Sequence, residues 1–268
     1  MKKGQVSIFV IVAIVIVAVI LGIYFLQGNL SQQSDKNLSP EAQQVKGYVD
    51  ECLKTTLTEG IITIGEQGGY NTLPEKSNTF FFFAKPYYFS GKQASVPGKD
   101  VLEKEITAYI QDNVDACLEN FSYFDGKGMK ISKGTNKAIV KINGLVVSAQ
   151  LTSSVNIDAG GSASSVKDFS ASVSPVRFDT LLAASNDIAS SETKDPRTMC
   201  LSCIKLTAST HGINVEILDT NDRNEYIFQL VDEQSNFSGT SYDYKFAGRY
   251  TFPDCTSLED CQNALSSQ

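Results

Sequence analysis

Residues 242–252 read YDYKFAGRYTF, a stretch in which aromatic and polar side chains alternate along the chain. Every second position carries an aromatic residue or glycine: Tyr242, Tyr244, Phe246, Gly248, Tyr250 and Phe252. Successive side chains of a strand point to opposite faces, so this period of two predicts a β-strand with one aromatic face.

Two segments before this strand have the apolar spacing of helices. The first begins at Ser39-Pro40-Glu41, where serine can cap and proline fits the first turn, and ends at Gly68-Gly69. Its predicted buried face is Val45, Val49, Cys52, Leu53, Leu57, Ile61 and Ile64. The second begins near Asp100, with Glu103 in capping-box register. Its predicted face is Leu102, Ile106, Ile110, Cys117 and Phe121.

From residue 128 the composition is typical of β-structure. Residues 138–147 and 149–157 are short β-branched runs, with Asn143-Gly144, inside the first of them, as a possible hairpin turn. Residues 159–175 are small and polar and predict an exposed strand pair or a long loop. A helix is predicted at 178–191, followed by a hairpin of 213–218 and 226–231. The predicted parts are therefore a helix–strand–helix part, 40–123, and a β-rich part, 124–268.

The N-terminus predicts a membrane anchor. Residues 6–26 read VSIFVIVAIVIVAVILGIYFL, 21 residues without a charge, and a helix of this length spans roughly 30 Å of hydrocarbon. Lys2 and Lys3 precede it, so the positive-inside rule leaves the N-terminus in the cytoplasm. We expect a cytoplasmic leader at 1–4, a transmembrane helix at 5–27 and a flexible tether at 28–39. The lipid bilayer is the expected partner of residues 6–26.

The expected fold class is α+β, with one N-terminal transmembrane helix followed by an extracytoplasmic domain that has an antiparallel sheet and several helices. The protein is expected in the cell membrane as a single-pass protein with an extracellular C-terminal domain.

The first residues, Lys2-Lys3-Gly4-Gln5-Val6-Ser7 running into an apolar helix, resemble the class III signal sequences of archaeal type IV pilins and archaellins. The resemblance covers about a dozen residues and implies cleavage between Gly4 and Gln5. It also implies packing of the apolar helix into a filament core. Many pilins have glutamate at the fifth mature position, where this chain has Phe9, which favours a monomeric anchor over a filament subunit. The remainder resembles uncharacterised membrane-tethered surface proteins of archaea.

The charge balance argues against nucleic-acid binding. Of 23 Lys and Arg residues, Lys2 and Lys3 precede the apolar segment, so 21 face 30 Asp and Glu residues beyond it. This net charge of −9 repels phosphate backbones, and the sequence shows no basic patch with interleaved aromatics.

Six cysteines are expected to form disulfides in an exported domain: Cys52, Cys117, Cys200, Cys203, Cys255 and Cys261. Cys255 and Cys261 can close a local loop, and Cys52 can join Cys117 from helix to helix. Cys200 and Cys203 can form a strained local bridge or find partners elsewhere. Two alternatives stay open: a redox Cys-x-x-Cys motif, and a tetrahedral zinc site from the last four cysteines. No cofactor is expected.

Residues 79–89 read TFFFFAKPYYF, with seven aromatic residues in eleven positions. They can form a stacking surface for sugars or lipid, for which Phe80, Phe82, Tyr87 and Tyr88 are the candidates. The alternative, which we favour, is a buried strand that closes the core between the two helices.

Few catalytic patterns are present. The single histidine, His211, has no Gly-x-Ser-x-Gly partner motif, and Asp219-x-Asn221 lacks the glycine and the later ligands of a calcium loop. A carboxylate pair for glycoside cleavage stays possible among the 30 acids. Asn120 and Asn236 fit the glycosylation sequon.

The leading hypothesis is a non-enzymatic surface module for adhesion, envelope structure or assembly with a protein or glycan partner. The alternatives are a tethered extracellular hydrolase acting through carboxylates on glycans or peptides, and a filament subunit.

Overall fold

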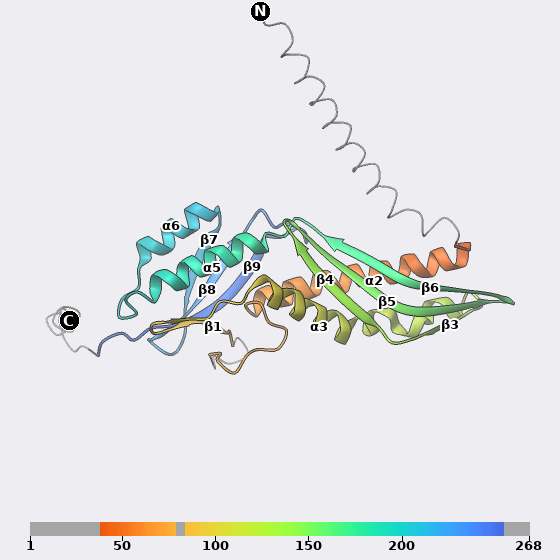
Figure 1. The fold of residues 1–268 in the computed structure, drawn as a ribbon, viewed down its shortest axis with the longest axis horizontal. Helices are drawn as coiled ribbons and strands as arrows, with labels where there is room; N and C mark the ends of the chain where they lie inside the picture. The colour runs from red at the N-terminus through yellow and green to blue at the C-terminus, as the bar shows by residue number, and fades with distance from the viewer. Residues whose placement is uncertain (1–37, 79–83, 255–268) are drawn as a thin grey trace, which may run out of the picture. The chain divides into compact units, whose positions relative to one another are not determined.

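The computed structural model describes residues 38–78 and 84–254, and the chain forms two compact units, 1–45 and 46–268. The elements are labelled in Figure 1. The helices are α2 (Pro40–Glu66), α3 (Lys99–Leu118), the 3-10 turn η2 (Glu119–Phe121), α4 (Ser122–Asp125), α5 (Phe178–Glu192) and α6 (Leu201–His211). The strands are β1 (Tyr87–Ser90), β2 (Gln93–Ala94), β3 (Met129–Lys133), β4 (Lys137–Asn143), β5 (Val146–Ala159), β6 (Ser162–Val173), β7 (Asn214–Asp219), β8 (Glu225–Asp232) and β9 (Tyr242–Arg249).

A five-stranded sheet is built around the strand predicted at 242–252. Its order is β2-β1-β9-β8-β7, with β1 parallel to β9 and the other neighbours antiparallel. The predicted strand is present as β9, which ends at Arg249, and its aromatic face is buried at Tyr242, Tyr244 and Phe246. Helix α5 covers this face, with the Phe178 ring edge-on to Tyr242 at 5.9 Å between centroids. Figure 1 shows α5 and α6 beside strands β7, β8 and β9.

The end of α2 lies against the same strand. The Tyr242 hydroxyl donates to the Ile61 carbonyl at 2.7 Å. A Cβ atom on Gly65 would lie only 2.5 Å from the Asp243 carbonyl oxygen, so glycine permits this close approach of helix and strand. The phenols of Tyr88 and Tyr244 are hydrogen-bonded at 2.6 Å, and Tyr88 also donates to the Gly68 carbonyl. Aromatic hydroxyls therefore anchor the C-terminus of α2.

The second sheet has four strands and is antiparallel throughout. The 14-residue strand β5 pairs along its length with β6 and, on its other side, with β4 and then β3. The predicted turn is displaced by one residue, because Asn143 pairs with Val146 and Gly144-Leu145 forms the loop. Residues 162–173, expected as an exposed strand pair or loop, form the single strand β6.

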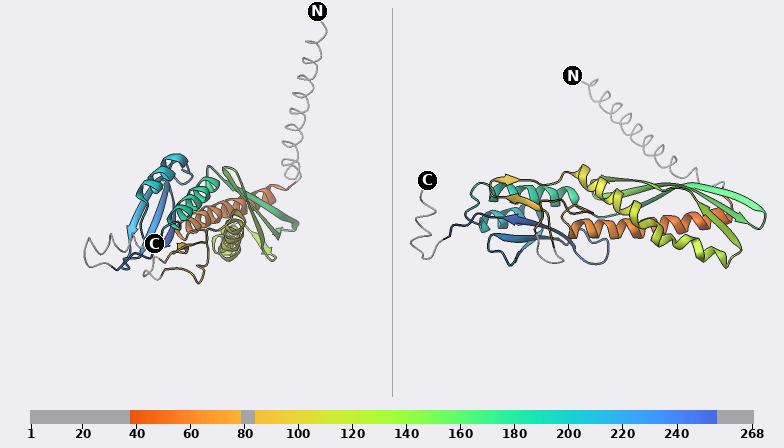
Figure 2. Two further views of the ribbon diagram at one scale, coloured as in Figure 1. Left: turned by 60° about the vertical axis from the view of Figure 1, so that its left-hand side comes forward. Right: turned by 90° about the horizontal axis from the view of Figure 1, so that it is seen from below.

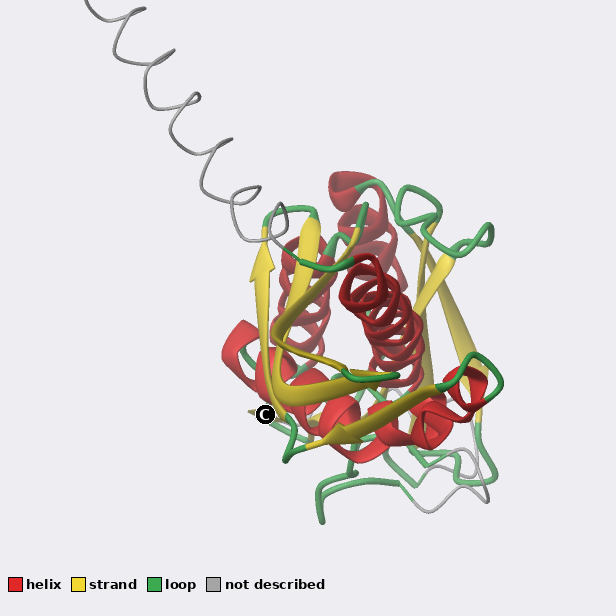
Figure 3. Cartoon of the chain, turned by 90° about the vertical axis from the view of Figure 1, so that its right-hand side faces the viewer, coloured by secondary structure: helices red, strands yellow, loops and turns green. Residues whose placement is uncertain are grey.

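Helices α2 and α3 cover both edges of this sheet. At the β6 edge, the Asp50 carboxylate of α2 accepts the Ser170 N–H at 2.9 Å. At the β4 edge, Glu103 of α3 accepts the Ile142 N–H at 3.0 Å and Thr107 accepts the Val140 N–H at 3.1 Å. Both helices run alongside the strands in Figure 2, and strands lie on several sides of the helices in Figure 3. These side chains accept hydrogen bonds from backbone N–H groups of the two edge strands. Without such partners, the N–H groups of an edge strand can pair with a strand of another chain.

The prediction of α2 is confirmed and that of α3 only in part, because Leu102, Ile106 and Ile110 are buried as predicted but the helix ends at Leu118, before Phe121. Ser39 Oγ accepts the Ala42 N–H at 3.2 Å at the start of α2. Gly69, with φ +87°, ends the helix by donating to the Ile64 carbonyl at 2.7 Å. The predicted face is buried at Val49, Cys52, Leu53, Leu57, Ile61 and Ile64. The predicted capping box of α3 is wrong, because Gly98 is the N-cap without a side-chain bond and Glu103 caps β4 instead.

The expected fold class needs correction. In the ranges 38–78 and 84–254, no helix has the length and apolarity needed to cross a bilayer. Residues 1–37, which include the predicted anchor, lie outside the described residues. The expected antiparallel sheet is instead two sheets, one of them mixed. The difference arises because β1 pairs in parallel with β9, with Tyr87 opposite Ala247, and local periodicity does not encode a pairing between such distant segments.

Candidate functional site

Two of the predicted disulfides are present. Cys52 of α2 and Cys117 of α3 are bonded with their Cα atoms 5.6 Å apart, the predicted helix-to-helix bridge. Cys200 and Cys203 are bonded with their Cα atoms 5.2 Å apart. Cys200 and Cys203 were two of the four ligands of the alternative zinc site. Because they are bonded to each other, neither has a thiolate that could bind a metal. Cys255 and Cys261 lie outside the described residues.

The Cys200–Cys203 bridge opens a helix, a context that sequence reasoning did not find. Cys200 is the N-cap of α6, and its Sγ accepts the Cys203 N–H at 3.3 Å. Beneath it, the buried Glu192 carboxylate accepts the Cys200 N–H at 3.1 Å and the Tyr250 hydroxyl at 2.8 Å. Burial, together with the hydrogen bond to Glu192, raises the pKa of Tyr250 far above its usual range, so the phenol stays a donor.

The described part of the aromatic segment is core. Tyr88 and Phe89 are buried in β1, and the Tyr88 ring stacks on Phe246 with centroids 4.3 Å apart. Tyr87 is half-buried, and its hydroxyl donates to Glu225. The segment pairs with β9 and does not close the core between the two helices as expected. Phe80 and Phe82 lie outside the described residues.

A different aromatic group reaches the surface. Tyr48 of α2 stacks on Tyr123 with centroids 6.0 Å apart, and its hydroxyl donates to the Cys117 carbonyl at 3.2 Å. Tyr123 is 58% exposed, with the Lys127 ammonium 4.3 Å from its ring centroid. Phe121 and Phe124 complete this cluster, which we call the Tyr48–Tyr123 surface. In the sequence, the three aromatic residues at positions 121, 123 and 124 were the signal that could have indicated this cluster.

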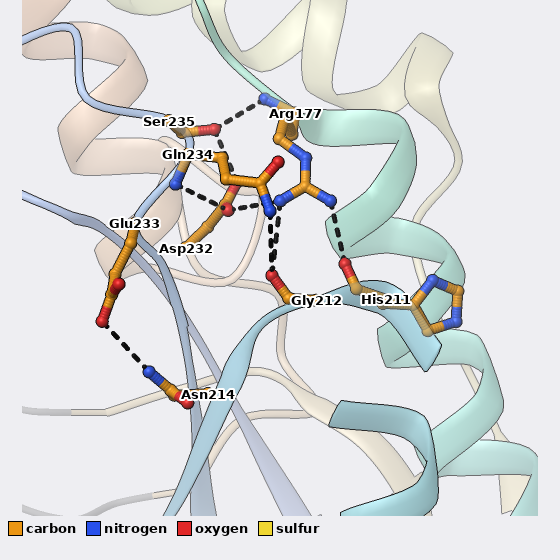
Figure 4. Close-up of polar contacts among 8 residues, drawn as sticks. All are labelled: Arg177, His211, Gly212, Asn214, Asp232, Glu233, Gln234 and Ser235. Atoms are coloured by element: carbon orange, nitrogen blue, oxygen red, sulfur yellow. Dashed lines mark hydrogen bonds and ion pairs between the residues drawn. The ribbon is translucent and has the colours of Figure 1, made fainter. Parts of the chain in front are cut away.

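A buried ion pair links α5 to the end of β8 (Figure 4). The Arg177 guanidinium lies 2.7 Å from the Asp232 carboxylate, whose side chain is fully buried. Ser235 Oγ donates to Asp232 at 2.6 Å and accepts the Arg177 N–H at 2.8 Å. Arg177 also donates to the His211 carbonyl at the C-terminus of α6. Each charge has several partners, so this cluster is built to hold α5, α6 and β8 together.

The single histidine is not part of a nucleophilic triad with Ser235. His211 Nε2 lies 2.8 Å from the Asp187 carboxylate, one element of such a triad. In Figure 4, however, the His211 ring points away from Ser235. The Ser235 hydroxyl is itself occupied by Asp232 and Arg177. The histidine therefore forms a contact between α5 and α6.

One small cavity holds two acids. It has a volume of about 190 Å³, and Glu66 and Asp243 contribute to its lining. The Lys245 ammonium lies 2.8 Å from Glu66 and 3.6 Å from Asp243. Burial raises the pKa of Asp243, Lys245 opposes the shift, and Glu66 adds to it. Two carboxylates with different environments suit acid–base chemistry, but the shared lysine keeps both in ion pairs.

Larger cavities lie along the four-stranded sheet. One of about 660 Å³ is lined by β3, β5 and β6, with Asp158 as the acid in its lining. One of about 460 Å³ lies between α2 and strands β5 and β6, lined in part by Asp50 and Glu51. Asp50 is occupied by the Ser170 N–H and by Lys46. Among residues 38–78 and 84–254, no group of three or more His, Cys, Asp or Glu residues is arranged to hold a metal ion.

Both described sequons are accessible. Asn120 is exposed in η2, within three consecutive non-glycine residues of positive φ, and Asn236 is exposed in the loop after β8. Gly4 and Gln5 lie outside the described residues. The hairpin predicted around Asp219 is confirmed, because β7 ends at Asp219 and pairs antiparallel with β8, which begins at Glu225.

Comparison with known proteins gives no relative: no family model matches the chain, nor does any curated protein or solved structure. The described residues themselves define the class, a disulfide-bonded α+β protein with two sheets and helices that cover the edges of one of them.

Proposed function

We propose that this chain is a cell-surface module without enzymatic activity, held at the membrane by residues 6–26 and serving adhesion, envelope structure or assembly. The C-terminal part lies outside the cytoplasm in this proposal. The observation that carries it is the pair of disulfides, since disulfides persist in oxidising compartments outside the cytoplasm.

The Tyr48–Tyr123 surface supports a binding role. Tyr123 is exposed beside Tyr48, with the Lys127 ammonium next to its ring, so this surface combines aromatic and polar groups, which suit contacts with sugar rings and with other aromatics. The nearby Cys52–Cys117 bridge fixes the helices that carry this surface. A rigid aromatic surface loses little conformational entropy when it binds.

Protease treatment of sealed native cells tests the location. We expect residues 46–268 to be digested without lysis while a cytoplasmic marker protein stays intact. Protection of this region until lysis would place it in the cytoplasm and end the proposal.

Binding of the full-length chain in nanodiscs to immobilised polysaccharides tests the surface. Tyr123→Ala should weaken binding by about fivefold, because a stacked aromatic contact contributes about 1 kcal/mol. Leu145→Ala is the matched control, since Leu145 is 55% exposed in the β4–β5 loop, away from the aromatic cluster.

The hydrolase alternative rests on Glu66 and Asp243, because these two acids share a cavity. For this function the ion pairs of Lys245 with Glu66 and Asp243 must break when substrate binds. Glu66→Gln and Asp243→Asn should then each abolish hydrolysis of a glycan or peptide panel, whereas the surface-module proposal expects no hydrolysis by any variant.

A further inference from the structure

The Cys200–Cys203 disulfide is placed where a thiolate is stabilised. Cys200 caps an eleven-residue helix, and its Sγ accepts the Cys203 N–H and lies 3.5 Å from Ser202 Oγ. Both cysteines are partly accessible to solvent. The partial positive charge of a helix N-terminus and its free N–H groups lower the free energy of a thiolate relative to a thiol.

The fold does not depend on this bridge to hold the segment. Glu192 accepts the Cys200 N–H from below, and the Pro196 carbonyl accepts the Thr251 N–H at 2.8 Å, which ties the loop to the end of β9. A bridge across a sequence separation of 3 also constrains the unfolded chain far less than one across 65. The disulfide can therefore open while α6 stays in place.

We propose that Cys200 and Cys203 form a thiol–disulfide exchange site through which this surface module, as a stoichiometric reactant and not as an enzyme, oxidises a dithiol in an extended segment of another protein.

The exchange runs in two balanced steps. A thiolate of the partner attacks Cys200 Sγ, the bond to Cys203 breaks, and Cys203 leaves as a thiolate that takes a proton. The second thiolate of the partner then attacks the partner's own sulfur in the mixed disulfide and releases Cys200. The partner ends as a disulfide and this chain as a dithiol, so two electrons and two protons pass from partner to chain. The α6 N-terminus stabilises the released Cys200 thiolate.

Two exposed leucines flank the disulfide along α6, one directly after Cys200 and one three residues after Cys203. Leu201 lies between the two cysteines and is 63% exposed, and Leu206, on the same helix, is 67% exposed. Exposed leucines beside a reactive sulfur give apolar contact to an unfolded or extended segment, in which apolar residues are accessible. This preference for an extended segment is the specificity we assign to the site.

Reduction of the oxidised full-length chain by increasing dithiothreitol is the first test, with alkylation of thiols and mass spectrometry of the peptides. Cys200 and Cys203 should become alkylated at a dithiothreitol concentration at least about tenfold below that for Cys52 and Cys117. Equal concentrations, or later reduction of Cys200–Cys203, would overturn the proposal.

Single variants then test which sulfur reacts. A leucine-flanked peptide whose cysteine carries a thionitrobenzoate group releases that coloured group when a protein thiolate attacks. Cys203→Ala should react at least about tenfold faster than Cys200→Ala, since Cys200 is the N-cap and its sulfur accepts a backbone N–H, whereas Cys203 lies inside the first turn. An intact Cys52–Cys117 bridge and unchanged circular dichroism show that both variants are folded. Equal rates would refute the role of Cys200.

The apolar contact is tested by Leu201→Ser with Leu206→Ser in the Cys203→Ala chain. The rate with the leucine-flanked peptide should fall by roughly fivefold. The rate with the small disulfide that bears only thionitrobenzoate groups should stay the same. Leu145→Ser is the control and should change neither rate. A fall with both reagents would refute apolar docking.

Discussion

Cys52–Cys117 joins two long helices across 65 residues of sequence, whereas Cys200–Cys203 joins positions three residues apart at the start of α6. The first belongs to the region where α2 and α3 cover the edges of the four-stranded sheet. The second belongs to the α5–α6 region beside the five-stranded sheet, where polar clusters around Asp232 and Glu192 already hold the helices. One bridge therefore stabilises its region, and the other is free to react. Four predictions test this difference.

The largest loss of stability is expected for the double variant Cys52→Ala, Cys117→Ala. The free energy of unfolding should fall by about 4 kcal/mol, because the unfolded chain loses a cross-link over a long loop. Denaturant unfolding of the full-length chain in detergent measures it. A loss below about 1 kcal/mol would mean that helix packing alone holds this region.

The ion pair at Asp232 is the main support of the α5–α6 region. Asp232→Ala should lower the free energy of unfolding by about 3 kcal/mol, because it leaves Arg177 without its buried carboxylate. Asp187→Ala is the matched control, since this exposed acid also links α5 to α6 and should contribute less than about 1 kcal/mol. If the two variants lose equal stability, Asp232 does not hold the region.

Removal of the local bridge should have a smaller effect. Cys200→Ala with Cys203→Ala should lower the free energy of unfolding by no more than about 2 kcal/mol, because the closed loop is short. The same denaturant experiment measures it. A loss equal to that of the Cys52–Cys117 double variant would remove the distinction between the two bridges.

The smallest effect concerns Glu103 and pH. Burial opposes the shift, but hydrogen bonds from the Ile142 N–H and Lys141 hold the pKa of Glu103 below its usual value of 4.5. The stabilisation is therefore present above the unfolded-state pKa and is lost as pH falls through the folded-state pKa. Glu103→Gln should cost about 1 kcal/mol at pH 7 and less at pH 3, as followed by denaturant unfolding.

Glu51→Gln is the control for this pH dependence, because Glu51 is an exposed acid on α2. Its unfolding free energy should match that of the unsubstituted chain at both pH values. If Glu103→Gln behaves in the same way, the carboxylate does not stabilise the β4 edge.

Local patterns in the sequence determined much of this protein. The alternation at 242–252 predicted β9 and its buried aromatic face, and the helical spacing before Gly68 predicted α2 with both of its ends. The two cysteines on the apolar sides of predicted helices indicated the Cys52–Cys117 bridge. These features follow from side-chain direction within one element, which a short stretch of sequence encodes.

Only the tertiary structure decided the pairings between distant segments. The parallel pairing of β1 with β9, the use of Glu103 and Asp50 to cover sheet edges, and the Glu192 carboxylate beneath Cys200 each join residues far apart in the chain or in different elements. A carboxylate looks the same in the sequence whether it caps its own helix or a neighbouring strand. The choice is made by which N–H groups the folded chain brings within hydrogen-bond distance.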